Sequence, residues 1–76
     1  MELIVSNNGK SVKLAWEDGT YSVHPIGTLI AVADTSDRIS FKLTGSRKTV
    51  YSVYFGDISP SRSDAAETVE ALNEIL

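Results

Sequence analysis

Hydrophobic and polar residues alternate along most of the first 56 positions, which is the pattern of β-strands with one buried face. The alternation is clearest over residues 10–16, where Val12, Leu14 and Trp16 fall on the same side of an extended chain. It recurs over residues 38–44, where every second residue is again apolar. Two strands with one buried face each are therefore predicted here.

Turn sequences separate such segments at short and regular intervals. Residues 7–9 (Asn-Asn-Gly) and 18–19 (Asp-Gly) combine residues that tolerate the backbone conformation of tight hairpins. Further turns are expected at 35–37 and 45–47, and short spacing of this kind is typical of an antiparallel meander. The predicted strands cover residues 2–6, 10–16, 21–24, 28–34, 38–44 and 48–55.

Pro25 interrupts the pattern, because proline cannot donate a hydrogen bond within a central strand. We expect the chain to bend or to change sheets at this point. The run that follows, residues 28–34, is almost continuously apolar, which predicts a strand covered on both faces. In the last strand, Tyr51 and Val53 are expected to face the core.

The C-terminal part of the chain changes to a helical period. Asp64, followed by Glu67 three residues later, predicts a helix start, with Ser59-Pro60 as an earlier alternative. From there one side of the helix is apolar and the opposite side is acidic. The apolar side contains Ala65, Val69, Leu72, Ile75 and Leu76, and the acidic side contains Glu67, Glu70 and Glu74. We expect the apolar side to dock on the sheet.

These elements predict a single α+β domain over residues 1–76. Residues 1–56 form an antiparallel meander of five to six strands, curled into a small sandwich or partial barrel, and residues 57–63 link it to an amphipathic helix at 64–76. A chain of 76 residues is too short for two separate cores. The expected core consists of Leu3, Val5, Val12, Leu14, Trp16, Leu29, Ile39, Phe41, Leu43, Tyr51, Val53, Phe55, Val69, Leu72 and Leu76.

Composition excludes several kinds of site and location. The chain has no cysteine, which excludes thiolate metal sites and thiol nucleophiles and fits a reducing compartment. No segment approaches the roughly 20 apolar residues that span a bilayer, and residues 1–5 lack the basic region of a signal peptide. We therefore expect a cytoplasmic protein with no membrane partner.

Candidate chemistry is sparse. His24 is the only histidine, so a site with two histidines from one chain is excluded, and no serine stands in a strained elbow motif. The acidic pairs Glu17-Asp18 and Asp34 with Asp37 lie in predicted turns rather than in a cleft. The glycines are dispersed and form no phosphate-binding loop. We expect no enzyme activity, no cofactor, no metal and no small-molecule substrate.

Charge is distributed unevenly within a net charge of −3. Residues 1–56 hold six cations and five anions, whereas residues 57–76 hold one cation and five anions. A small β barrel that binds nucleic acid through a basic and aromatic strand face is the alternative function. Its candidate residues are Lys13, Arg38, Lys42, Arg47, Lys48 and Tyr51, with Tyr54 as a second ring for stacking. The acidic balance counts against it, because phosphate affinity depends on uncompensated cations.

Association with another chain is the favoured function. Edge strands carry unpaired N–H and C=O groups, and the candidate edges, residues 2–6 and 21–24, contain few of the devices that block pairing. The small core and the apolar C-terminus point the same way. We expect a structural or protein-interaction module that forms a homo-oligomer or binds a protein partner.

The order of features near the C-terminus is also informative. The meander ends in residues 53–58 (Val-Tyr-Phe-Gly-Asp-Ile), and a polar link leads into residues 64–73 (Asp-Ala-Ala-Glu-Thr-Val-Glu-Ala-Leu-Asn). This arrangement resembles short accessory proteins encoded among the structural genes of tailed bacteriophages. The likeness covers mainly residues 50–76 and includes no diagnostic motif. It implies a virion or virion-assembly component that works through contacts with other proteins.

Overall fold

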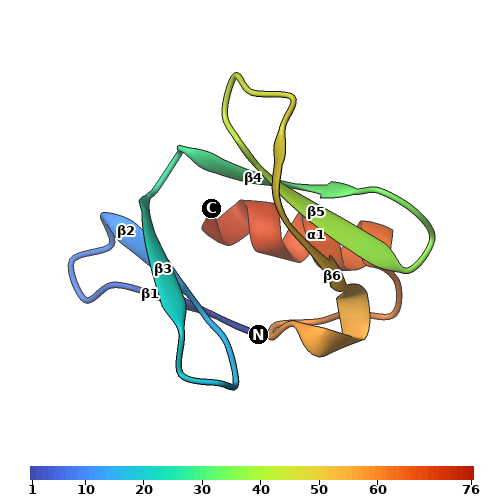
Figure 1. Ribbon diagram of the computed structural model, residues 1–76, viewed down its shortest axis with the longest axis horizontal. Coiled ribbons are helices and arrows are strands. Elements are labelled where there is room, and N and C mark those ends of the chain that lie inside the picture. Colours follow the sequence, from blue (N-terminus) through green and yellow to red (C-terminus); the bar gives the residue numbers. More distant parts are fainter.

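A computed structural model describes residues 1–76 and contains six antiparallel strands followed by one α-helix (Figure 1). In chain order the elements are β1 (Glu2–Val5), β2 (Ser11–Ala15), β3 (Tyr21–Pro25), β4 (Leu29–Ala33), β5 (Arg38–Leu43), β6 (Thr49–Tyr54), the 3-10 turn η1 (Phe55–Asp57) and α1 (Ala65–Ile75). The N-terminal sheet has the order β1-β2-β3 and the C-terminal sheet the order β4-β5-β6. The α+β class and the antiparallel meander are confirmed. α1 is neither long nor apolar enough to cross a membrane.

The chain passes from one sheet to the other directly after Pro25, as predicted. The connection turns at Gly27, whose φ of 91° lies in the region that favours glycine. Gly27 O accepts from Thr44 Oγ1 at 2.9 Å, and Gly27 N donates to Leu76 O at 3.0 Å. The connection is therefore tied both to the β5–β6 hairpin and to the end of α1.

The core lies between the inner faces of the two sheets and the apolar side of α1. Its fully buried apolar residues are Leu3, Val12, Leu14, Leu29, Ala31, Ile39, Phe41, Ile58, Ala65 and Leu72. Half-buried apolar side chains pack around it, among them Trp16, Tyr51, Val53, Phe55, Val69 and Leu76. α1 packs mainly on β4, with a smaller contact on β5 (Figure 1). The expected docking of its apolar side is confirmed.

Two residues of the predicted core lie at the surface. Val5 is 44% exposed and Leu43 is 42% exposed. Alternation places both on an inner face, but each is the last residue of its strand and is followed by a hairpin turn. Other residues therefore pack against only one side of each of these side chains. The prediction that Val5 and Leu43 belong to the core was wrong.

β4 also differs from its prediction. Leu29 and Ala31 are buried, but Ile30 and Val32 point to the outer face of the C-terminal sheet and are exposed. A continuous apolar run predicts cover on both faces. Here α1 covers one face only, so half of this run lies in solvent.

The helix begins where the acidic capping pattern predicted. Asp64 is the N-cap residue, and its Oδ1 accepts from Glu67 N at 2.8 Å, so the Ser59-Pro60 alternative is not the start. Thr68 is completely buried, and its hydroxyl donates to Asp64 O at 2.7 Å and accepts from Arg62 N at 2.9 Å. These bonds fix the direction from which the link enters α1.

Candidate interaction surfaces

Each three-stranded sheet has two edge strands, and the edge of β4 is closed by the helix. Ala31 N donates to Asn73 Oδ1 and Asn73 Nδ2 donates to Ala31 O, both at 2.9 Å. The carboxamide thus takes the place that the peptide group of a neighbouring strand would occupy. No further strand can pair at the centre of β4 while Asn73 is bound there.

The edge of β1 is partly covered by the link between η1 and α1. Leu3 N donates to Ser59 O at 3.0 Å, and Ser59 N donates to Met1 O at 2.9 Å. These bonds form a short parallel bridge beside Glu2. The prediction of an open edge was wrong for this half of β1, and only the stretch around Val5 remains uncovered.

The edge of β6 is covered at its centre by an arginine. Phe55 N donates to Asp37 O at 2.9 Å, so the backbone groups of Tyr54 and Ser52 point away from β5. Arg38 Nη2 donates to Ser52 O at 3.2 Å and Arg38 Nε donates to Ser52 Oγ at 3.3 Å. The pairing of β5 with β6 also contains a bulge, which disfavours regular pairing with a further strand.

β3 is the edge strand whose centre has no such cover. Trp16 N donates to Thr20 O at 2.9 Å, so Trp16 and Thr20 form a hydrogen-bonded pair. Non-hydrogen-bonded and hydrogen-bonded pairs alternate from there along β2 and β3, and Tyr21 and Val23 belong to non-hydrogen-bonded pairs. It follows that the N–H and C=O groups of Tyr21 and Val23 point away from β2. No other part of the chain forms a hydrogen bond with them. These four backbone groups, together with the two side chains, are called the β3 edge below.

The side chains of the β3 edge are apolar and lie on the outer face of the N-terminal sheet. Tyr21 is 64% exposed and Val23 is 55% exposed, more than any other large hydrophobic residue in the molecule. Ile4 and Lys13 lie in the same cross-strand row as Val23. Lys13 Nζ stands 5.3 Å from the centre of the Tyr21 ring, a favourable cation–π distance. The result is an exposed apolar surface with one cation at its border.

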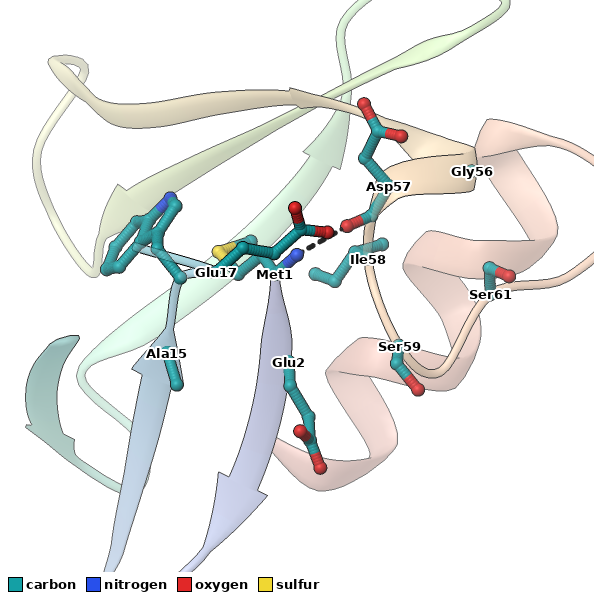
Figure 2. Close-up of a pocket in the computed structure, with 10 residues that line it drawn as sticks. Met1, Glu2, Ala15, Glu17, Gly56, Asp57, Ile58, Ser59 and Ser61 are labelled. Carbon is teal, nitrogen blue, oxygen red and sulfur yellow. Dashed lines mark hydrogen bonds between the residues drawn. The ribbon is translucent and has the colours of Figure 1, made fainter. Parts of the chain in front are cut away.

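The largest groove lies at the other end of the N-terminal sheet, beside η1 (Figure 2), with a volume of about 530 Å³. The N-terminal amino group donates to Asp57 O at 2.6 Å within it. Glu2 and Asp57 point in opposite directions, so these two acids do not form a carboxylate pair (Figure 2). Trp16 and Glu17 line both this groove and a neighbouring one of about 480 Å³. Neither groove contains a histidine or a cysteine.

His24 lies outside both grooves. Its Nε2 is 3.0 Å from Ser22 Oγ, on the face of β3 opposite to Tyr21 and Val23. No three side chains of histidine, aspartate or glutamate come close enough together to hold a metal ion. The contact of His24 that the structure shows is the hydrogen bond with Ser22 in the same strand.

The structure divides the residues of the nucleic-acid alternative among several places. Lys13 belongs to the N-terminal sheet, and Tyr51 lies on the inner face of the C-terminal sheet, with its ring centre 4.7 Å from that of Trp16. Arg38 and Lys42 do share the outer face of the C-terminal sheet, where Tyr54 is the ladder partner of Arg38. Arg47 and Lys48 lie in the β5–β6 hairpin, at one end of that face.

The sequence predicts the strand that contains the β3 edge but does not single out Tyr21 and Val23. Their signal was present, because both alternate with the polar residues Ser22 and His24. When apolar residues occupy alternate positions of a short strand, their side chains are normally expected to face the core. In this strand the apolar residues take the solvent face and the polar residues turn inward.

Comparisons of the chain with protein-family models, with curated proteins and with solved structures found no match.

Proposed function

We propose that the protein is a non-enzymatic interaction module that binds another polypeptide by adding a strand at the β3 edge. The observation that carries this proposal is the difference among the four edge strands. Asn73 closes β4, the Ser59 backbone closes half of β1, and Arg38 occupies the centre of β6. The β3 edge alone offers two adjacent outward residues with both backbone groups free.

Strand addition uses both parts of this edge. Backbone hydrogen bonds supply affinity that is independent of sequence, and alternate side chains supply selectivity. Tyr21 and Val23 present apolar area on one face of the site, so an incoming strand that is apolar at alternate positions buries that area. A role in virion assembly stays a prediction from the resemblance at residues 50–76, and that resemblance implies only that the protein contacts other proteins.

The proposal is tested with a probe strand and backbone NMR. The probe is an N-acetylated peptide that alternates valine and threonine and carries a lysine at each end. When it is added to the isotope-labelled protein, we expect the amide signals of Tyr21 and Val23 to shift first and in a saturable way. The variant Val23→Pro, which lacks one outward N–H group, should bind the probe more weakly.

Two results would contradict the proposal. One is a probe that shifts only amides at β1, β4 or β6, and the other is no shift at any amide at millimolar peptide. Val50→Pro is the matched control, because Val50 also stands in an edge strand and is exposed. It should bind the probe as the unmodified protein does.

A further inference from the structure

We infer that the strand added at the β3 edge is β3 of a second copy, paired antiparallel about a two-fold axis at Ser22. The inference rests on the proposed function of this edge. It adds the identity of the partner and the register of the pairing. The two N-terminal sheets would join into one six-stranded sheet with a β3 strand of each copy at its centre.

The register follows from which backbone groups are free. With the axis at Ser22, Tyr21 of each copy lies opposite Val23 of the other, and their outward N–H and C=O groups form four hydrogen bonds. An axis at Val23 would place Tyr21 opposite Pro25, which has no N–H group to donate. Pro25 O already accepts from Thr28 N at 3.2 Å and from Thr28 Oγ1 at 2.6 Å. Only the Ser22 axis satisfies all the free groups at the centre of this strand.

The side chains of the β3 edge are complementary to themselves under the same symmetry. Each Tyr21 ring would lie beside Val23 of the second copy, and pairs of an aromatic and a β-branched residue are favourable across strands. The cross-strand row of Ile4, Lys13 and Val23 would then continue into Tyr21 and Ala15 of the second copy. An isologous contact of this kind closes on itself and yields a dimer rather than a filament.

Charge does not oppose this pairing. β3 contains no aspartate, glutamate, lysine or arginine, so the two-fold axis brings no like charges face to face. Charged residues are the usual protection of an exposed edge strand, and β3 lacks them. α1, which holds Glu67, Glu70 and Glu74, packs mainly on β4 in the other sheet.

The size of the contact sets its strength. A standard protein interface of about 800 Å² per partner would take up about one sixth of the 4709 Å² surface of this chain. One five-residue strand with two apolar side chains covers less than that. We therefore expect a reversible dimer with a dissociation constant in the range of about 1 to 100 μM.

The first measurement is sedimentation velocity of the whole chain from about 1 μM to about 1 mM, a range that brackets this dissociation constant. Val23→Pro removes two of the four hydrogen bonds, one from each copy, so its dimer should dissociate about thirtyfold more readily. Val50→Pro should dimerise as the unmodified chain does. Thermal unfolding of both variants establishes that they are folded.

The second measurement does not depend on a proline. Under the inferred symmetry the two copies of residue 22 form a non-hydrogen-bonded pair with Cα atoms about 4.5 Å apart, which suits a disulfide. The chain has no cysteine of its own, so Ser22→Cys introduces a single thiol. The matched control is Ser52→Cys, because Ser52 is an exposed residue at the centre of β6, the edge strand that Arg38 covers. Mild oxidation should cross-link Ser22→Cys at least about tenfold faster than Ser52→Cys, because pairing raises its effective concentration.

The outcomes separate this inference from the proposed function. A chain that stays monomeric at every concentration, or a Ser22→Cys variant that cross-links no faster than Ser52→Cys, overturns the second-copy inference. If the probe peptide still shifts Tyr21 and Val23 in that case, the edge binds a different polypeptide and the proposed function stands. A concentration-dependent dimer that Val23→Pro weakens, together with rapid cross-linking at position 22, supports both.

Discussion

The carboxamide of Asn73 forms two hydrogen bonds with a single residue of β4, because it accepts from Ala31 N and donates to Ala31 O, both at 2.9 Å. Asn73 belongs to α1 and Ala31 to the edge of the C-terminal sheet. One side chain therefore fastens the helix to the sheet and also occupies the backbone groups through which another strand would pair.

We expect Asn73→Ala to lower the free energy of unfolding by about 1–3 kcal/mol, since two partly buried hydrogen bonds are lost and each contributes about 0.5–1.5 kcal/mol. Urea unfolding followed by far-UV circular dichroism measures this change. Glu74→Ala is the control, because Glu74 is exposed and forms no hydrogen bond, and its effect should stay within about 0.5 kcal/mol. Equal loss in the two variants would show that the Asn73 bonds contribute little.

The side chain of Phe41 should contribute more to stability than any other single apolar residue of the C-terminal sheet. Phe41 is completely buried on the central strand, between its ladder neighbours Ala31 and Tyr51. We expect Phe41→Ala to cost about 3–5 kcal/mol, which is a large share of the stability of a 76-residue domain. The milder variant Phe41→Leu keeps the fold measurable if Phe41→Ala unfolds. Val50→Ala, at an exposed position, should change the midpoint of thermal unfolding little.

The sequence predicted the elements of this fold well because their signals are local. Alternation identified the strands, Pro25 marked the change of sheet, and Asp64 with Glu67 marked the helix start. Each of these signals depends only on residues a few positions apart. The same alternation wrongly predicted that Val5 and Leu43 are buried. Alternation indicates which face of the sheet a side chain lies on, but not whether other residues still pack over that face at the end of the strand.

The contacts that close the sheet edges could not be predicted from such local signals. Asn73 contacts a residue 42 positions away, and the Ser59 backbone reaches β1 across most of the chain. A polar residue on a helix gives no sign of the strand beside which it will lie. The open edge at β3 is therefore identified by elimination, once the structure shows what closes the others.

The hairpin between β2 and β3 should show a characteristic dependence on pH. The Thr20 hydroxyl donates to Asp18 Oδ1 at 2.6 Å and Thr20 N donates to the same oxygen at 3.0 Å. These bonds, the hydroxyl first, hold the pKa of Asp18 below its usual 3.8. Because the folded pKa is the lower one, the stabilisation is present above pH 3.8 and is lost as the pH falls through the folded pKa.

Thr20→Val removes the hydroxyl donor and should raise the pKa of Asp18 toward 3.8. Titration of the Asp18 side-chain carbon by NMR measures the shift directly. Thr35→Val is the matched control, since the Thr35 hydroxyl donates to Asp37 in a different turn. An Asp18 titration that is the same in Thr20→Val and in the unmodified protein would show that the hydroxyl has no influence.

The nucleic-acid alternative makes a different prediction, namely retention on a single-stranded DNA column that decreases with salt. Arg38 and Lys42 lie on the C-terminal sheet, and Arg47 and Lys48 lie in the hairpin at its end. Four phosphate contacts from these residues would make binding about fiftyfold weaker between about 50 and 200 mM salt. We expect no retention at about 50 mM salt, because the net charge is −3 and Arg38 is already bound to Ser52.

Charge reversal on the two sheets makes the column experiment decisive. Lys42→Glu changes the outer face that carries Arg38 and Tyr54, whereas Lys10→Glu places the same charge in the β1–β2 hairpin of the other sheet. If the unmodified chain is retained, and Lys42→Glu abolishes retention while Lys10→Glu does not, binding occurs at the C-terminal sheet. Equal loss in both variants would instead indicate general ion exchange, because a specific face responds only to charges that lie on it.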